Sequence, residues 1–280
     1  MDQYKTYPII LAHGIARFDE LSRQLLDIDN RDALDALHYF KNIRTHLQSH
    51  GFYVRHTNVD WAGSVDERSG QLKQQIEGVL NDEELGAEQV HIIAHSMGGL
   101  DSRHMLFDNR DEGFHEKIAS LTTIATPHNG SPIADSIVGG IGDLLKKLGF
   151  GEGTHDLTTE ACCKFNAESE AFERECGVHF RSYAGKQKRR YVFTPLKPAW
   201  DIVHESEPEF GNDGLVSVDS ARWKEEYFRK PVLDADHFNL CGWWDFSELL
   251  HLKLRGQLEG EIKAFYLCIA ERLAKRFPPA

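Results

Sequence analysis

The sequence predicts an α/β fold in which a mainly parallel central sheet is flanked by helices. Short apolar runs alternate with longer helical stripes along the chain, which is the order expected when helices join parallel strands. The first run, Tyr7-Pro8-Ile9-Ile10-Leu11-Ala12, is apolar at successive positions, as expected of a strand that is buried on both faces. No internal repeat, low-complexity tract or linker divides the chain, so we expect a single domain over residues 1–280.

The individual elements follow from local patterns. Strands are expected at 7–12, 52–59, 90–94, 118–125 and 231–233, and helices at 32–50, 64–80, 100–107 and 262–277. Ser64 is a suitable N-cap for the second helix, whose first turn carries Asp66 and Glu67. Residues 131–150 have apolar residues at helical spacing, but glycines at 139, 140 and 142 interrupt them. This segment is either an ordinary core helix or a mobile lid.

Composition excludes several classes of function. The formal net charge of −12 argues against a nucleic-acid partner, since such binding needs a basic surface. No apolar run is long enough for a transmembrane helix. The five cysteines include no Cys-x-x-Cys pair and do not form the pattern of a disulfide framework. Because the first strand starts almost at the N-terminus, we expect a cytoplasmic protein, or a secreted one if a signal peptide has been removed.

The stretch Ala94-His95-Ser96-Met97-Gly98-Gly99 directly follows the apolar run at 90–93 and precedes the helical stretch at 100–107. This context predicts a sharp strand-to-helix turn that exposes the hydroxyl group of Ser96 as a nucleophile. The backbone of such a serine is strained, so the residues two before and two after it must be small. Ala94 and Gly98 meet that demand. The alternative is a glycine-rich turn with an incidental serine.

A serine nucleophile needs a base that accepts its proton and an acid that orients the base. In hydrolases with such a turn the three residues follow in the order Ser, acid, His. Asp213 lies in the segment 211–216, a tight turn that enters an apolar strand, although Asn-Asp-Gly also serves simply as a turn. His237, in a short loop after the apolar run at 231–233, is the candidate base. His204 and His251 are its rivals.

The oxyanion hole of such a hydrolase is formed by two backbone N–H groups. One belongs to the residue after the nucleophile, here Met97, and the other to a loop after an early strand. His13-Gly14-Ile15 directly follows the first strand, so the N–H group of Ile15 is the expected second donor.

Taken together, these residues resemble the bacterial family I triacylglycerol lipases of the α/β-hydrolase superfamily. The resemblance rests on residues 7–14, 94–99, 123–131 and 212–216 and on the histidine loop at 237, which follow in the order of that family. It implies an α/β-hydrolase fold and a catalytic triad in which Ser96 is the nucleophile, Asp213 orients the base, and His237 is general base and acid. It also implies that Ile15 and Met97 form the oxyanion hole.

The resemblance further implies a helical lid or cap within residues 131–175, since lipases of this family carry their lid at the position of 131–150. Such a lid would cover an acyl pocket and open during transient contact with a lipid–water interface. Residues expected to contribute to substrate binding or to the lid are His13, Gly14, Ile133, Ile137, Val138, Ile141, Leu144 and Leu145.

Two positions depart from the family pattern. Many members bind a structural calcium ion through an aspartate two residues after the catalytic histidine and a second aspartate upstream. Asn239 and Lys197 occupy the corresponding positions here, and a lysine cannot bind a cation. We therefore expect no calcium, with the charge of Lys197 in its place, and no metal or cofactor in the chemistry. The cysteine that often follows the Asn-Asp-Gly motif is also absent.

The sequence thus predicts a serine hydrolase that acts on acylglycerols or other carboxylic esters through an acyl-enzyme. A short-chain carboxylesterase, a phospholipase A1 or a thioesterase on the same fold is the alternative, because a fold does not determine the substrate. From a different class, a binding module that kept the fold without chemistry is a further alternative. The presence of Ser96, Asp213 and His237 together argues against it.

Overall fold

The computed structural model describes residues 4–15, 35–36, 38–61, 63–138, 152–244 and 252–278. These residues form a six-stranded sheet in the order β2-β1-β3-β4-β5-β6, and each neighbouring pair of strands is parallel. The strands are β1 (Ile9–Ala12), β2 (Val54–His56), β3 (Val90–His95), β4 (Ile118–Ile124), β5 (His179–Lys186) and β6 (Phe228–Leu233). This arrangement confirms the predicted α/β fold with a parallel central sheet.

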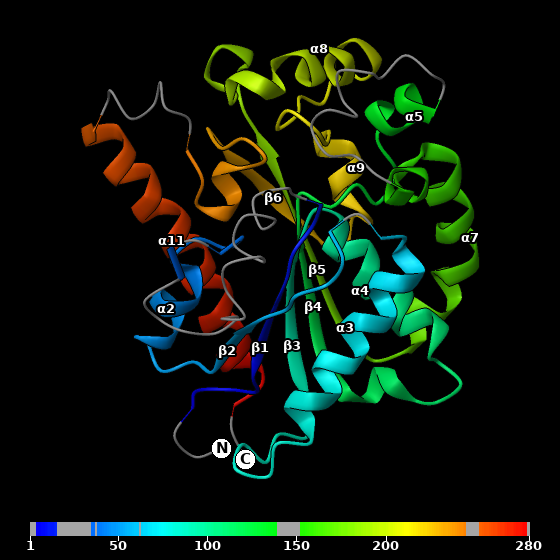
Figure 1. Ribbon diagram of the computed structural model, residues 1–280, viewed down its shortest axis with the longest axis vertical. Coiled ribbons are helices and arrows are strands. Elements are labelled where there is room, and N and C mark those ends of the chain that lie inside the picture. The colour runs from blue at the N-terminus through cyan, green and yellow to red at the C-terminus, as the bar shows by residue number, and fades with distance from the viewer. Residues whose placement is uncertain are drawn as a thin grey trace.

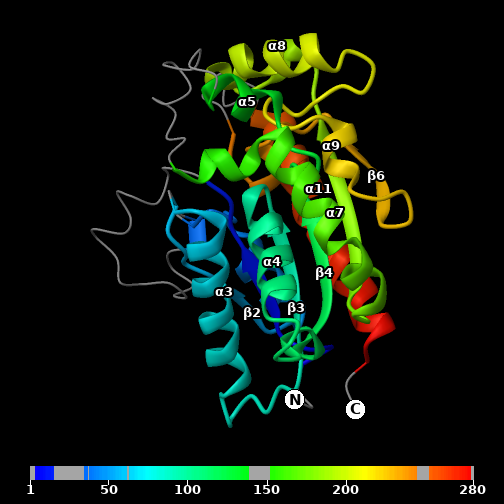
Figure 2. The same cartoon turned by 90° about the vertical axis from the view of Figure 1, so that its right-hand side faces the viewer.

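Helices cover both faces of the sheet. Figure 1 shows α2 and α11 on one face and α3, α4 and α7 on the other, and Figure 2 shows the second group from the front. In both views α5 and α8 lie beyond the edge at which the strands end. The bounds are α2 (Ile43–Gln48), α3 (Val65–Leu80), α4 (Met97–Asp108), α5 (Pro132–Val138), α7 (Thr159–Glu175), α8 (Lys197–Ser206), α9 (Val218–Arg222) and α11 (Leu252–Arg276).

Strand β1 is apolar at every position because both of its faces are covered by helices. Successive side chains of a strand point to opposite faces of the sheet. Ile9 and Leu11 belong to the core beneath α2 and α11, whereas Ile10 and Ala12 belong to the core beneath α3 and α4. The strand is therefore buried on both faces, as its sequence predicts.

Helix α3 also forms as predicted. The Ser64 side chain accepts a hydrogen bond from the Glu67 backbone, and the Glu67 side chain accepts one from the Ser64 backbone, which is a complete capping box. None of the described helices is both long and apolar enough to cross a membrane. All five cysteines are free thiols.

The helix predicted over 32–50 is shorter than expected. In its described part α2 begins only at Ile43, because Asn42 has a left-handed backbone (φ 57°) that a continuous helix cannot contain. The carboxylate of Asp35 accepts hydrogen bonds from the backbone and the hydroxyl group of Thr45 (3.0 and 2.7 Å). Burial raises the pKa of Asp35, but the hydrogen bonds from His56 and Thr45 outweigh burial and bring it down to about 2.

Two strand predictions need correction. The strand expected over 52–59 is reduced to Val54–His56, since only these residues pair with β1. The apolar strand expected after Asp213 does not form. Instead the turn closes through a single bridge between Asn212 and Ser217, and α9 begins at Val218. The Ser217 side chain accepts a hydrogen bond from the Ser220 backbone (3.0 Å), and this cap starts a helix where apolarity alone suggested a strand.

Candidate active site

Ser96 occupies the sharp turn between β3 and α4. Its backbone angles, φ 55° and ψ −133°, lie outside the usual regions for a residue with a side chain, a strain of about 1–3 kcal/mol. Two hydrogen bonds hold it: the Ser96 N–H group donates to Ile124 O (3.0 Å), and the Thr126 hydroxyl donates to Ser96 O (2.7 Å). A Cβ atom at Gly98 would lie 2.5 Å from Ala12 O, so this position must be glycine. The structure thus has the strained serine turn that the sequence predicts.

Asp213 and His237 come together although they lie on separate loops. The Nδ1 atom of His237 is 2.8 Å from Asp213 Oδ2, and both side chains are buried (3% and 0% exposed). The other carboxylate oxygen, Oδ1, accepts hydrogen bonds from the backbone N–H groups of Leu215 and Val216 (3.0 and 2.8 Å). The His237 backbone also donates to Asp213 O (2.9 Å), which ties the two loops together. The carboxylate is therefore fixed in position and faces the imidazole.

The imidazole of His237 lies beside the serine turn. Its ring centroid is 4.5 Å from that of His95, the residue directly before Ser96. Because Nδ1 faces Asp213, the Nε2 atom is the one available to a serine hydroxyl. The rival His204 lies on α8, where its ring packs against Trp200 at 4.7 Å. His251 lies outside the described residues.

Behind the serine turn lies a buried polar cluster of Tyr39, His95 and Cys241 that the sequence did not predict. The Tyr39 hydroxyl is 2.7 Å from His95 Nδ1, and the Cys241 thiol is 3.3 Å from the same atom. Burial lowers the pKa of His95 well below its usual value, and the nearby His237 lowers it further. The His95 imidazole is therefore neutral and adds no positive charge beside His237. The sequence offered one signal, since His95 directly follows the residues 90–94 that are expected to form a buried strand.

The loop after β1 approaches the serine turn closely. A Cβ atom at Gly14 would lie 2.6 Å from the Cβ atom of Ser96. Ile15 is half-buried against an apolar cluster that includes Met97, whose side chain is fully buried. Ile15 and Met97 thus pack in one apolar cluster beside the serine turn, and their role as oxyanion donors stays a prediction.

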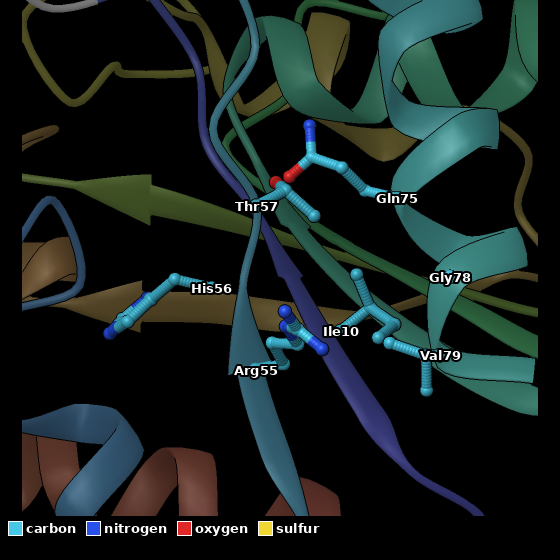
Figure 3. A pocket seen from close by; sticks show the side chains of 7 residues that line it. All are labelled: Ile10, Arg55, His56, Thr57, Gln75, Gly78 and Val79. Carbon is cyan, nitrogen blue, oxygen red and sulfur yellow. The ribbon is translucent and has the colours of Figure 1, made fainter. Parts of the chain in front are cut away.

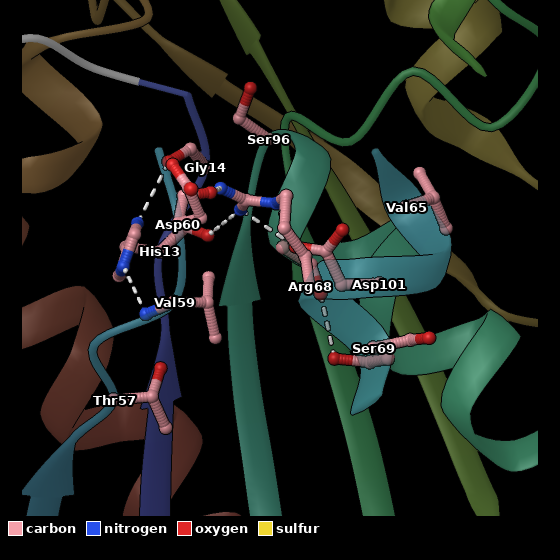
Figure 4. A network of polar contacts seen from close by, with 12 residues as sticks. His13, Gly14, Thr57, Val59, Asp60, Val65, Arg68, Ser69, Ser96 and Asp101 are labelled. Atoms are coloured by element: carbon pink, nitrogen blue, oxygen red, sulfur yellow. Dashed lines mark hydrogen bonds and ion pairs between the residues drawn. The ribbon is translucent and has the colours of Figure 1, made fainter. Parts of the chain in front are cut away.

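A buried ion pair fixes this loop (Figure 4). Arg68, on α3, donates to His13 O (2.8 Å) and forms an ion pair with Asp101 on α4 (2.7 Å). The His13 ring bridges the Gly14 carbonyl group (2.8 Å) and the backbone N–H group of Val59 (3.1 Å). Burial raises the pKa of Asp101, and Arg68 opposes that shift. His13 therefore positions the loop through its ring and its carbonyl group. Sequence reasoning missed Arg68 and Asp101, which lie 33 residues apart.

The expected lid residues divide into three groups. Ile133 and Ile137, on α5, are buried in a cluster with Ala199 and Val203 of α8. Val138 is 53% exposed at the end of α5. Ile141, Leu144 and Leu145 lie outside the described residues, so the lid over 131–175 stays a prediction. The far part of that segment is anchored, because Glu173 of α7 forms a buried ion pair with Arg103 of α4 (2.7 Å).

Two surface cavities differ in their distance from the serine along the fold. One, of about 740 Å³, lies between α4, α5 and α7 and is lined partly by Leu100, one turn after the serine. The other, of about 180 Å³, lies between β1, β2 and α3 (Figure 3). His56 lines it, but its side chain points away from α3 and binds Asp35 (2.8 Å). Burial lowers the pKa of His56 to about 4. The second cavity therefore offers no base near a nucleophile.

The side chains on either side of His237 are engaged within the protein, at the position where the resemblance would place a calcium ion. The Asn239 side-chain oxygen accepts a hydrogen bond from the Asp236 backbone (3.0 Å), and its amide group donates to Trp243 O (3.0 Å). The Asp236 carboxylate accepts backbone hydrogen bonds from Phe193, Phe238 and Asn239. Calcium needs several free oxygen ligands. These oxygens are engaged by the protein, and Lys197, at the start of α8, cannot be a ligand.

Comparisons with known proteins find similarity to lipases and to an acyltransferase family. Residues 12–140 match the family model of lecithin:cholesterol acyltransferase. The chain is 28% identical to triacylglycerol lipase 2 of Saccharomyces cerevisiae, an alignment that covers 98% of this chain and 94% of the yeast protein. It is also 28% identical to a triacylglycerol lipase of Vibrio cholerae, over 76% of this chain and 72% of that protein. A third match, 35% identical to a triacylglycerol lipase of Pseudarthrobacter phenanthrenivorans, covers 50% of this chain and 38% of that protein.

Solved structures agree on the fold. The mature lipase of Bacillus licheniformis superimposes with a TM-score of 0.66 at 17% identity, over 90% of this chain and 92% of that one. A metagenomic carboxyl esterase superimposes with a TM-score of 0.62 at 19% identity, over 84% of this chain and 66% of the esterase. Because yeast and bacterial lipases both match, the comparisons do not single out bacterial family I. The structure therefore has the α/β-hydrolase fold, and the sequence is similar to those of triacylglycerol lipases.

Proposed function

We propose that this protein is a serine carboxylic ester hydrolase that acts on acylglycerols through Ser96, His237 and Asp213. One observation carries the proposal: a buried His237–Asp213 pair (2.8 Å) stands beside a serine in strained backbone geometry. Such a serine turn is the nucleophile position of the α/β-hydrolases. The relatives named triacylglycerol lipases support acylglycerols as the substrate class.

In the proposed reaction the Nε2 atom of His237 accepts the proton of Ser96 while the serine oxygen attacks the ester carbonyl carbon. The carbonyl π bond opens, and the N–H groups of Ile15 and Met97 stabilise the resulting oxyanion. Asp213 stabilises the imidazolium ion without taking its proton. The intermediate collapses, the alcohol leaves with the proton from His237, and an acyl-serine remains. A water molecule, whose proton His237 accepts, then attacks the acyl carbon. The bond between that carbon and the serine oxygen breaks, Ser96 recovers the proton from His237, and the carboxylic acid is released.

Replacing Ser96 by Ala tests the nucleophile. We expect hydrolysis of p-nitrophenyl butyrate to fall by roughly 10⁶-fold, as in serine proteases that lose this hydroxyl group. Circular dichroism and the unfolding midpoint are expected to match the wild type, since the substitution removes one oxygen atom. A p-nitrophenyl alkylphosphonate is expected to modify the wild type once, at Ser96, and to leave the variant unmodified. Retained hydrolysis by a folded Ser96→Ala protein would refute both the triad and the enzyme assignment.

The substrate class is tested with p-nitrophenyl esters of increasing chain length and with emulsified triacylglycerol. A lipase is expected to hydrolyse long-chain esters and to gain activity once the substrate forms an interface, because transient contact with that interface exposes the acyl pocket. Exclusive activity on short soluble esters, with no gain on the emulsion, would reassign the protein as a carboxylesterase. Activity on a phospholipid or an acyl thioester alone would indicate the phospholipase or thioesterase alternative.

We also propose that the enzyme uses no calcium, because the oxygen atoms of Asn239 and Asp236 are engaged by backbone groups. Protein purified without chelators is expected to contain less than stoichiometric calcium and to keep its activity and melting temperature in EDTA. Stoichiometric calcium would contradict the proposal.

The five free thiols support a reducing compartment, such as the cytoplasm, as the place of action. Fractionation of cells that express the protein at its natural level tests that location.

A further inference from the structure

A cationic cavity lies far from the proposed active site, between the sheet and the C-terminal half of α11. Its volume is about 230 Å³. No acidic side chain lines it within the part of the chain that the structure describes. Its polar wall is formed by four arginines, a histidine, a tyrosine and a threonine: Arg181, Arg229, Arg272, Arg276, His179, Tyr183 and Thr122.

The secondary structure explains how these side chains converge. His179, Arg181 and Tyr183 alternate along β5 and therefore face the same side of the sheet, the side that α11 covers. Arg272 and Arg276 are four residues apart on α11 and share one face of that helix. Towards the middle of α11 the same interface is apolar, since the ring of Phe265 packs edge-on against Tyr183 at 5.0 Å. The interface thus changes from apolar to cationic along the helix.

The lack of counter-charges is unusual for this chain, which has 44 acidic and 32 basic residues. Its three fully buried arginines, Arg44, Arg68 and Arg103, each have a carboxylate partner. By contrast, none of the four cavity arginines forms an ion pair with a carboxylate of a described residue.

The contacts that the cavity arginines do make are to neutral groups. Arg181 donates to Phe180 O (2.8 Å), and Arg272 donates to the Tyr183 hydroxyl (3.4 Å). An adjoining depression is lined by Glu173 and Glu226, but Glu173 is already bound by Arg103 and Lys224 (2.7 and 3.4 Å). The cavity therefore keeps most of its donors available.

The titration of two lining groups is consistent with an excess of positive charge. Burial and the charges of Arg181, Arg276 and Arg229 together lower the pKa of His179 to about 4, and burial contributes most. Burial lowers the pKa of Arg181 as well, together with the charges of Arg229 and Arg276. Neutral at physiological pH, His179 is a hydrogen-bonding group among the guanidinium ions. An anion in the cavity would offset the repulsion among these ions.

We infer that this cavity is a binding site for a small phosphate-class anion. Guanidinium groups bind the oxygen atoms of phosphates in pairs of parallel hydrogen bonds, and several of them here surround one space. Sites for drug-sized ligands usually measure about 300–1,000 Å³, so a volume of about 230 Å³ fits a phosphate group with little attached to it.

The position of the cavity favours a soluble anion over a lipid headgroup. Ser96 follows the last residue of β3, whereas His179 and Arg229 lie at the first and second residues of their strands. Because all six strands are parallel, the two sites are at opposite ends of the sheet. Figure 1 shows that α11 runs from the active-site end to the end where both termini lie. A bilayer bound at the arginines would therefore lie at the far end from Ser96.

Titration of the full-length protein with inorganic phosphate tests the site. The measurements are calorimetric binding and the melting temperature at pH 7.5, with chloride at matched ionic strength as the reference. The test variant is Arg229→Gln/Arg276→Gln, since neither side chain hydrogen-bonds to a residue that the structure describes. Arg229 and Arg276 are exposed, so the matched control is Arg110→Gln/Arg190→Gln, which removes the same charge from two other exposed positions.

Saturable binding is expected for the wild type and the control, with affinity reduced about 100-fold in the test variant, roughly tenfold for each charged hydrogen-bond donor removed. In proton NMR, phosphate is expected to raise the pKa of His179. Equal stabilisation of all three proteins would indicate a general salt effect and overturn the proposal. In a second arm, binding to phosphatidylcholine vesicles only when they contain phosphatidic acid, without binding of free phosphate, would overturn the soluble anion and assign a headgroup instead.

Discussion

Replacing Gly14 by Ala is expected to displace the loop after β1 (residues 13–15), the proposed oxyanion loop, while leaving the fold intact. The added Cβ atom would lie 2.6 Å from Ser96 Cβ, 3.0 Å from the Tyr39 hydroxyl oxygen and 3.1 Å from His95 O. Ordinary contact begins at 3.4 Å, so the new methyl group must move about 0.8 Å away from Ser96 (3.4 − 2.6). The Tyr39 hydroxyl is held by His95 (2.7 Å) and cannot give way freely. The loop must therefore move, and the N–H group of Ile15 moves with it.

The size of the effect follows from the geometry of the oxyanion hole. Loss of one donor typically reduces kcat by about 10²–10³-fold, or roughly 2.7–4 kcal/mol, and a displacement of about 1 Å can reduce it by about 10²-fold. We therefore expect Gly14→Ala to lower kcat for p-nitrophenyl butyrate by about 10²-fold, with little change in KM. The effect is on kcat because the oxyanion forms only in the transition state.

Steady-state kinetics and thermal unfolding of three proteins make the test. The matched control is Gly78→Ala on α3, where a Cβ atom would meet nothing within 4 Å. That variant is expected to keep its kcat and to gain about 1 kcal/mol of stability, because alanine favours a helix more than glycine does. If Gly14→Ala is folded and retains the kcat of the wild type, the loop does not carry an oxyanion donor and the reasoning is wrong.

Three further predictions concern Asp213, Asp101 and the fully buried His91 of β3. In Asp213→Asn the side-chain carbonyl oxygen is expected to keep the two backbone hydrogen bonds that Oδ1 accepts, so the amide N–H₂ group faces His237 and forces the wrong tautomer of its ring. We expect kcat to fall about 10⁴-fold, and a fall of less than tenfold would contradict this role of Asp213. Asp101→Asn leaves the buried Arg68 guanidinium without its counter-charge and is expected to cost about 3–5 kcal/mol in urea denaturation, whereas an unchanged midpoint would show that the pair is dispensable. Burial lowers the pKa of His91 from 6.5 to about 3, so as the pH falls the unfolded chain is protonated at this residue before the folded protein is. Below pH 6.5 this residue is therefore expected to reduce the free energy of unfolding by about 1.4 kcal/mol per pH unit. His91→Gln is expected to make the dependence of that free energy on pH shallower.

The parts of the fold that the sequence predicts well are those with a strong local cause. β1 is apolar at successive positions because both faces are covered, and α3 carries its complete capping box within four residues. β5 was missed because its polar residues, such as Arg181, interrupt any apolar run. The strand expected after Asp213 was wrong because the Ser217 cap, a single hydrogen bond, outweighed two apolar residues. Whether a short segment becomes a helix or a strand depends on individual hydrogen bonds and tertiary contacts, which a local hydrophobic pattern does not reveal.

The candidate site shows the same division. The sequence alone identified Ser96, Asp213 and His237 as candidates, because the turn, the loop and the small neighbours each follow from local backbone requirements. Only the tertiary structure decided that His237 rather than His204 meets Asp213, since the two loops are 24 residues apart and pair through their backbones. It alone brought Arg68 and Asp101 beneath the oxyanion loop.

The sequence by itself determined the parallel α/β architecture and the chemical groups available for catalysis, because burial patterns and turn residues act over a few neighbouring positions. The tertiary structure alone decided which of those groups meet. It alone assembled the arginine cavity, where Arg181 of β5 meets Arg276 of α11 although the two residues are 95 positions apart in the sequence. The physical reason is that hydrogen bonds and ion pairs act over a few ångströms in space, whatever the separation along the chain.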